Sequence, residues 1–229
     1  MVITATRLTS GAALSAITAG SLFILVQLIH PTEDAANVAS TAWAVTHGLT
    51  LAMAVLALIG ITGMYLHQAE RAGLLGLIGY AYFATCFLVI ACYTFVEAFV
   101  LPTLTDTVPR YVNDVVALPA GGTVVGDVGA LHTVALMSAS TYLVGGLVFG
   151  LSTFRARVLS RPAALLLVAG AVSTILVPFL PHAAARLTAV PVGLALAWLG
   201  VSLWGAARAT SRPGTSAAPR ESVRPAGVA

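Results

Sequence analysis

Residues 73–101 read GLLGLIGYAYFATCFLVIACYTFVEAFVL, an almost unbroken apolar run in which Glu97 is the only charged residue. A helix needs about 20 apolar residues to cross the hydrocarbon core of a bilayer, so this run is long enough to span one. Its surplus length predicts a tilted helix, or one whose C-terminal end projects from the bilayer. The run therefore indicates a membrane-spanning α-helix.

Five further apolar runs flank this one along the chain. They cover residues 9–29, 43–66, 128–152, 162–180 and 187–206. The composition agrees, because 59% of the 229 residues are hydrophobic and only 8% are charged, whereas soluble domains carry about 25% charged residues. We predict an all-α fold, a polytopic transmembrane helical bundle of six spans that occupies residues 1–206.

The two ends of the chain are assigned from their composition. The run at 9–29 is long for the apolar core of a signal peptide, and no small-residue cleavage motif closes it, so we expect a first span. Residues 207–229 consist mainly of Ser, Pro, Ala and Arg, which cannot bury enough apolar surface to fold. They are expected to form a disordered cytoplasmic tail.

Arginine predicts the orientation in the membrane. The chain has eleven Arg and no Lys, and nine of the Arg fall on one side of the six predicted spans. Only Arg110 and Arg186 fall on the other side. Because cytoplasmic flanks retain positive charge, we predict a multi-pass protein of the cell (plasma) membrane with both termini inside. The Arg residues form no single basic patch, so nucleic acid is not an expected partner.

Titratable residues on the outer side form the candidate site. His47, Glu97 and His132 each lie about one turn inside a different span, at similar depth. Ionisable groups at the hydrocarbon boundary are costly unless they face a partner, water or the bundle interior. We predict that these side chains converge in an outward-opening polar pocket, with Tyr93 lining it one turn deeper, and we take all four as candidate catalytic residues.

Several chemistries fit this set of residues. Two histidines and a carboxylate match a catalytic zinc set, His47 and His132 are a candidate haem-ligand pair, and Glu97 is a candidate acid for a lipidic substrate. The sequence leaves the cofactor and any metal unknown. The alternative function is a non-catalytic membrane protein, either an accessory subunit or a lipid-binding module.

Structural interpretations also apply to these and other polar residues. Glu97 can lie in the headgroup region, and His132 can donate a hydrogen bond to a loop carbonyl. Trp43 near a span end is typical of an interfacial anchor. Residues 67–71 (HQAER) on the Arg-rich side are most simply a solvated turn.

Small residues and prolines within the runs bear on packing. Gly146 and Gly150 form a GxxxG-type pair, which favours close helix packing. Pro178 and Pro191 fall inside the fifth and sixth runs, where we expect kinks. Loop 102–127 carries Pro and Gly breakers and has room for a short surface helix.

Three segments carry a family resemblance: residues 67–79 (HQAERAGLLGLIG), 93–103 (YTFVEAFVLPT) and 155–170 (RARVLSRPAALLLVAG). They resemble the uncharacterised multi-span integral membrane proteins common in high-GC Gram-positive bacteria, which implies the architecture and no particular activity. A weaker likeness is to the small membrane-bound terpene cyclases, which use an intramembrane acid next to aromatic residues. That likeness implies an isoprenoid substrate for Glu97, although Val96 and Ala98 replace the aromatic neighbours of the cyclase Trp-Glu-Phe signature.

Overall fold

The computed structural model describes residues 3–119 and 121–210, and every regular element in these ranges is a helix. The all-α prediction is confirmed. The long elements are α1 (Ala5–Ile29), α3 (Thr41–Phe95), α5 (Leu131–Ala156), α6 (Arg161–Ser173) and α8 (Val190–Thr210). The short ones are α2 (Ala35–Val38), η1 (Val96–Val100), η2 (Leu101–Thr103), α4 (Pro109–Ala117), η3 (Thr174–Phe179) and α7 (His182–Leu187).

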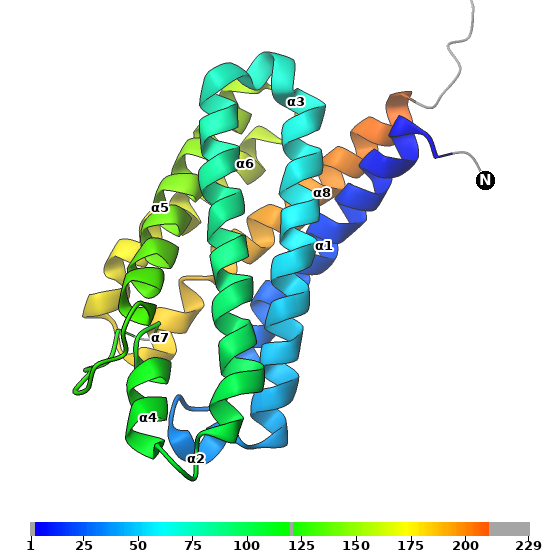
Figure 1. Ribbon diagram of the computed structural model, residues 1–229. Coiled ribbons are helices and arrows are strands. Elements are labelled where there is room, and N and C mark those ends of the chain that lie inside the picture. Colours follow the sequence, from blue (N-terminus) through cyan, green and yellow to red (C-terminus); the bar gives the residue numbers. More distant parts are fainter. Residues whose placement is uncertain (1–2, 120, 211–229) are drawn as a thin grey trace, which may run out of the picture.

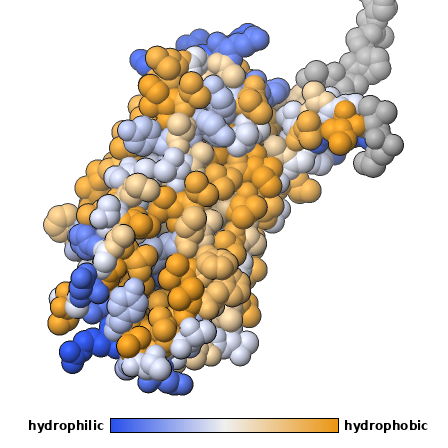
Figure 2. Space-filling view, in the orientation of Figure 1, coloured by the Kyte–Doolittle hydropathy of each residue, from blue (hydrophilic) through white to orange (hydrophobic). Residues whose placement is uncertain are grey.

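Five helical segments in the described residues are long and apolar enough to cross a membrane. Apolar side chains cover much of the visible flank of the bundle, and hydrophilic residues gather toward its two ends (Figure 2). This distribution is the one that a helix bundle surrounded by lipid requires, because lipid tails solvate apolar side chains and not charged ones. The chain is therefore compatible with an integral membrane protein.

The longest segment, Thr41–Thr103, is a helical hairpin and not one straight helix. A straight helix of 63 residues would extend about 95 Å, three times the thickness of a hydrocarbon core. Gly73 interrupts α3 with φ 57° and ψ −152°, a conformation that favours glycine. Figure 1 shows α3 reversing direction in this region, so residues 41–72 form a first arm and residues 74–103 a second.

Contacts at both ends of the hairpin show that its arms run antiparallel. Near the turn, the Tyr65 and Tyr80 rings stack with centroids 4.8 Å apart, and the Thr62 and Tyr80 hydroxyls lie 3.1 Å apart. At the far end, Trp43 Nε1 donates to the Glu97 backbone carbonyl at 2.9 Å. The beginning and end of this long segment therefore meet, which is the basis of the site described below.

The long helices contact one another in a closed ring, in the order α3, α5, α6, α8, α1 and back to α3. Small residues let the backbones approach. A Cβ added at Gly146 would lie 2.6 Å from Ala171 Cβ, and one at Gly150 would lie 2.7 Å from Val168 Cγ2, both on α6. The predicted packing role of this glycine pair is confirmed.

The C-terminal third departs from the sequence prediction in two places. Pro178 lies in the 3₁₀ helix η3, where the regular α6 has already ended at Ser173. Pro191 is the second residue of α8, so the kink predicted there is wrong: proline is tolerated in the first turn, where backbone N–H groups have no helical partner. Helix α8 continues to Thr210, past the predicted boundary at 206, and the rest of the predicted tail, residues 211–229, lies outside the described residues.

A cap covers the end of the bundle opposite the α3 turn (Figure 1); it consists of α2, α4 and residues 118–119 and 121–130. The expected surface helix in the long loop is α4, and the Asp114 carboxylate fixes the following segment by accepting from the backbone N–H groups of Val125 and Gly126 at 3.0 and 2.9 Å. The cap shares an apolar cluster with α3. Trp43 belongs to that cluster with no exposed surface, so its prediction as an interfacial anchor is wrong.

Candidate functional site

His47 and Glu97 form a buried pair at the capped end of the α3 hairpin. His47 lies in the first arm, and Glu97 lies in η1, a π-helical turn in the second arm. The ring nitrogen His47 Nε2 is 3.5 Å from the carboxyl oxygen Glu97 Oε2. Only 2% of His47 and 8% of Glu97 is exposed. Two titratable groups therefore face each other where the hairpin closes.

Trp43 holds both members of the pair. Its backbone carbonyl lies 3.0 Å from His47 Nδ1, and because a carbonyl can only accept, Nδ1 is the protonated nitrogen in this contact. Its indole stacks on the His47 ring with centroids 4.0 Å apart and an interplanar angle of 22°. Its Nε1 donates to the Glu97 backbone carbonyl. With Nδ1 occupied, Nε2 is the nitrogen free to exchange a proton with Glu97.

A second polar layer lies beside this pair. The guanidinium of Arg186, in α7, pairs with the Glu33 carboxylate, and its Nη2 lies 2.9 Å from His30 Nδ1. The His30 ring centroid is 5.1 Å from that of His47. Burial lowers the pKa of His30 to about 4, and the neighbouring Arg186 charge acts in the same direction. His30 is therefore neutral near pH 7.

These side chains line a cavity of about 300 Å³ between the end of α1, the two arms of α3 and α7. We call it the outer cavity because the predicted orientation places it on the outer side. Its polar lining comprises Gln27, His30, Glu33, His47, Thr50, Glu97 and Arg186. Its apolar lining comprises Val26, Pro119, Val177, Ala185 and Ala189. The cavity thus combines titratable groups with an apolar wall.

The structure brings together only part of the predicted site. His47 and Glu97 converge, as predicted from their depth in the two spans. His132 is exposed at the second position of α5, so its predicted place beside the pair is wrong. Tyr93 is buried, and its hydroxyl donates to the Val115 carbonyl of the cap at 2.7 Å. It does not line the outer cavity, so the prediction that Tyr93 lines the same pocket one turn deeper is wrong.

Sequence reasoning did not select His30, Glu33 or Arg186. The predicted topology puts them on the outer side, but they come from segments about 150 positions apart, and no spacing rule relates such segments. Arg186 offered one usable signal. It is one of only two Arg on the side where positive charge is scarce, and such a cation needs a carboxylate or a headgroup nearby.

The side chains of the site do not form a metal centre. Within residues 3–119 and 121–210, no group of three or more His, Cys, Asp or Glu side chains is arranged to hold a metal ion. The two predicted haem ligands, His47 and His132, are respectively buried and exposed on different helices. What the arrangement offers is an imidazole nitrogen and a carboxyl oxygen 3.5 Å apart in a buried setting, which can compete for one proton.

Comparisons with known protein families, curated proteins and solved structures found no match to this chain. Its function is therefore argued from the site alone.

Proposed function

We propose that this chain is a six-span protein of the cell membrane, with both termini in the cytoplasm, that carries out acid–base chemistry on a lipidic substrate in the outer cavity. The two arms of α3 supply two of the six crossings, and the nine-to-two Arg distribution supports the orientation. The observation that carries the chemistry is the buried contact between His47 and Glu97.

The pair suits proton transfer because its proton has two alternative positions. With Nδ1 donating to the Trp43 carbonyl, one proton is shared between His47 Nε2 and Glu97 Oε2. When Glu97 gives this proton to a substrate, its carboxylate remains beside a neutral His47 ring whose Nε2 carries no proton. In the reverse direction, the carboxylate takes a proton from the substrate. Positioned groups of this kind contribute about 10²- to 10⁴-fold in rate.

The lining of the outer cavity suggests an amphipathic substrate. Val26, Val177 and Ala189 offer apolar contact, and Arg186 and His30 offer hydrogen-bond donors or acceptors to a polar end. A lipid or isoprenoid with one polar group satisfies both halves of the lining. This supports the lipidic class without selecting a member of it.

A non-catalytic role is the second candidate, and one set of contacts favours it. The Arg186–Glu33 pair joins α7 to the segment after α1, and Trp43 joins the two arms of α3. The same residues thus clamp the capped end of the bundle. In an accessory subunit or a lipid-binding module, these residues would only stabilise the capped end of the bundle.

A deuterium-transfer assay separates the two candidates and requires no identified substrate. Purified protein is incubated in D₂O buffer with a total lipid extract of its source cells, and the lipids are analysed by high-resolution mass spectrometry. We expect the unmodified protein to generate a lipid species with new carbon-bound deuterium, and Glu97→Gln to reduce its formation by at least about 100-fold, because the amide keeps the shape and removes the exchangeable proton.

Two exposed residues on the same side provide matched controls. Asp106→Asn and His132→Gln remove titratable groups that do not line the outer cavity, so both variants should keep the full rate. If Glu97→Gln forms the same labelled lipids as the unmodified protein, acid–base catalysis is wrong and the clamp function is favoured.

A further inference from the structure

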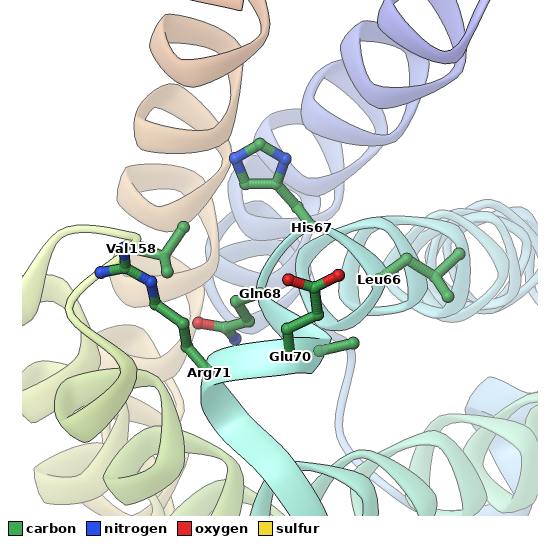
Figure 3. A pocket seen from close by; sticks show the side chains of 7 residues that line it. Leu66, His67, Gln68, Glu70, Arg71 and Val158 are labelled. Carbon is green, nitrogen blue, oxygen red and sulfur yellow. The ribbon is translucent and has the colours of Figure 1, made fainter.

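A second cavity, of about 510 Å³, lies at the opposite end of the bundle where α3 reverses; we call it the turn cavity (Figure 3). Its lining includes Leu66, His67, Gln68, Glu70, Arg71 and Val158. The sequence suggested a solvated turn for this segment. The structure instead places a mixed polar and apolar cavity there, separate from the outer cavity and from the proposed acid–base site.

Gln68 is the unusual member of this lining. It is 98% buried, given its 2% exposure, and its Nε2 donates to Thr153 Oγ1 at 2.8 Å. Its carboxamide oxygen Oε1 is buried and has no hydrogen-bond partner in the described part of the chain. Native proteins leave few buried polar atoms in this condition, and a missing donor often belongs to a water or a ligand. In Figure 3 this oxygen lies on the side facing Arg71.

Opposite charges lie on either side of the Gln68 side chain. Figure 3 shows the Gln68 side chain between those of Glu70 and Arg71. Both charged residues are exposed, and no salt bridge between them is formed in the structure as described. A ligand with a cationic donor beside an anionic acceptor would meet Glu70 and Gln68 Oε1 with the first group, and Arg71 with the second. The planar guanidinium of Arg can bond two oxygens of a phosphate at once.

The turn cavity also borders the lipid-facing surface. Leu66, which lines it, is 68% exposed, and Leu74 just beyond the turn is 72% exposed. Side chains of this kind on a membrane helix face acyl chains. A ligand held in the cavity therefore has apolar surface beside it.

The geometry points to a binding site for the headgroup of an aminophospholipid of the phosphatidylethanolamine type. Its primary ammonium donates hydrogen bonds to Gln68 Oε1 and the Glu70 carboxylate, its phosphate accepts from Arg71, and its acyl chains lie along Leu66. Three ammonium N–H donors satisfy the unpartnered oxygen and the carboxylate together. A quaternary ammonium has the same charge but no N–H, so the site discriminates between the two.

A graded lipid series tests this on the unmodified full-length protein. Detergent-purified protein is titrated with short-chain phosphatidylethanolamine, its N-methyl and N,N-dimethyl derivatives, and phosphatidylcholine, and Kd is measured for each by native mass spectrometry. We expect Kd to rise with each N–H removed, to about tenfold or more between the ends of the series, because a hydrogen bond to a charged group is stronger than one between neutral groups. Phosphatidylglycerol should bind no better than phosphatidylcholine.

Variants locate the effect in the turn cavity. Glu70→Gln and Gln68→Met should each reduce the preference for phosphatidylethanolamine to within about twofold, and Arg71→Gln should weaken all the phospholipids alike. Arg155→Gln, which removes an exposed Arg outside this lining, should leave the series unchanged. Unchanged helix content by circular dichroism confirms that each variant folds. If Gln68→Met does not fold, Glu70→Gln still tests the proposal, because Glu70 is exposed.

Two results would overturn the proposal. One is equal affinity for all four amine lipids, which would mean that the ammonium hydrogen bonds do not contribute. The other is a preference for phosphatidylethanolamine that Glu70→Gln leaves intact. If free phosphoethanolamine binds as tightly as the lipid, the contact with Leu66 contributes nothing. The ligand would then be a free small molecule and not a membrane lipid.

Discussion

Trp43 is the residue on which the geometry of the outer site depends. One indole stacks on His47 and donates to the Glu97 backbone, and the Trp43 carbonyl accepts from His47. Three contacts thereby fix the ring nitrogen that faces the carboxyl group. Trp43 and His47 are four residues apart and therefore share one face of a helix, but only the closure of the hairpin brings Glu97 to the same place.

His30 makes the stability of the capped end dependent on pH. Its pKa is about 4 in the folded protein against an ordinary 6.5, chiefly because the ring is buried. Between these values the unfolded chain binds more protons, so the free energy of unfolding falls as pH decreases from 6.5 to 4, and the contribution is complete above 6.5. We expect a loss of about 1–2 kcal/mol, less than the full shift implies, because the ring is partly exposed.

Thermal unfolding in detergent at several pH values measures this effect. The difference in Tm between the unmodified protein and His30→Gln should shrink as pH falls from 6.5 to 4, because the variant has no ring to protonate. His132→Gln, which removes an exposed histidine, should follow the unmodified protein throughout. Parallel curves for the unmodified protein and His30→Gln would show that His30 does not contribute.

At the scale of elements, the close contact between α3 and α5 depends on glycine. A Cβ added at Gly79 would lie 2.5 Å from the backbone nitrogen of Phe149, a distance that backbone atoms cannot relieve without a shift of the helix. We expect Gly79→Ala to reduce the free energy of unfolding by about 1–3 kcal/mol. Thermal or denaturant unfolding in detergent would measure it.

Gly48 provides the control within the same helix. A Cβ there meets nothing within 4 Å, so Gly48→Ala should be neutral or stabilise by up to about 1 kcal/mol through its better helix propensity. If Gly79→Ala and Gly48→Ala change the free energy of unfolding equally, the close contact between α3 and α5 does not require glycine at position 79.

The elements also show which features a sequence can predict. Apolar runs located the long helices, since burial in lipid requires a continuous apolar stretch whatever the tertiary contacts. The direction of a single side chain was less predictable. His132 and His47 both follow a span boundary by about one turn, yet one is exposed and the other buried, because the rotation of each helix is set by its neighbours.

At the scale of the whole molecule, the orientation in the membrane is testable by labelling. In a background without Cys86 and Cys92, a membrane-impermeant maleimide applied to intact cells should modify Thr123→Cys in the outer segment. It should leave Arg155→Cys and Gly214→Cys unmodified until the cells are opened. The prediction follows from the Arg distribution, and the inverse labelling pattern would contradict it.

The shape of the whole molecule explains why the site was only partly foreseen. Depth in the membrane is a one-dimensional property, and the sequence predicts similar depths for His47 and Glu97. The contacts of Arg186 with Glu33 and His30 need the ring of helices to close, so that α7 meets the segment after α1. Long-range closure of this kind leaves no local pattern in the chain.

The central claim is that His47 and Glu97 hold one proton between them and exchange it, and nuclear magnetic resonance of isotope-labelled protein tests it most directly. The protein carries ¹⁵N in the histidine rings and ¹³C in the glutamate carboxyls. The His47 signals are the ones that disappear in His47→Gln, and the Glu97 signal is the one that disappears in Glu97→Gln. Replacing one member of a hydrogen-bonded pair changes the signals of the other. We predict that the ¹⁵N signal of His47 Nε2 moves in Glu97→Gln, while Nδ1, bonded to the Trp43 carbonyl, keeps the signal of a protonated nitrogen. Identical His47 ring signals in the unmodified protein and in Glu97→Gln would contradict the account.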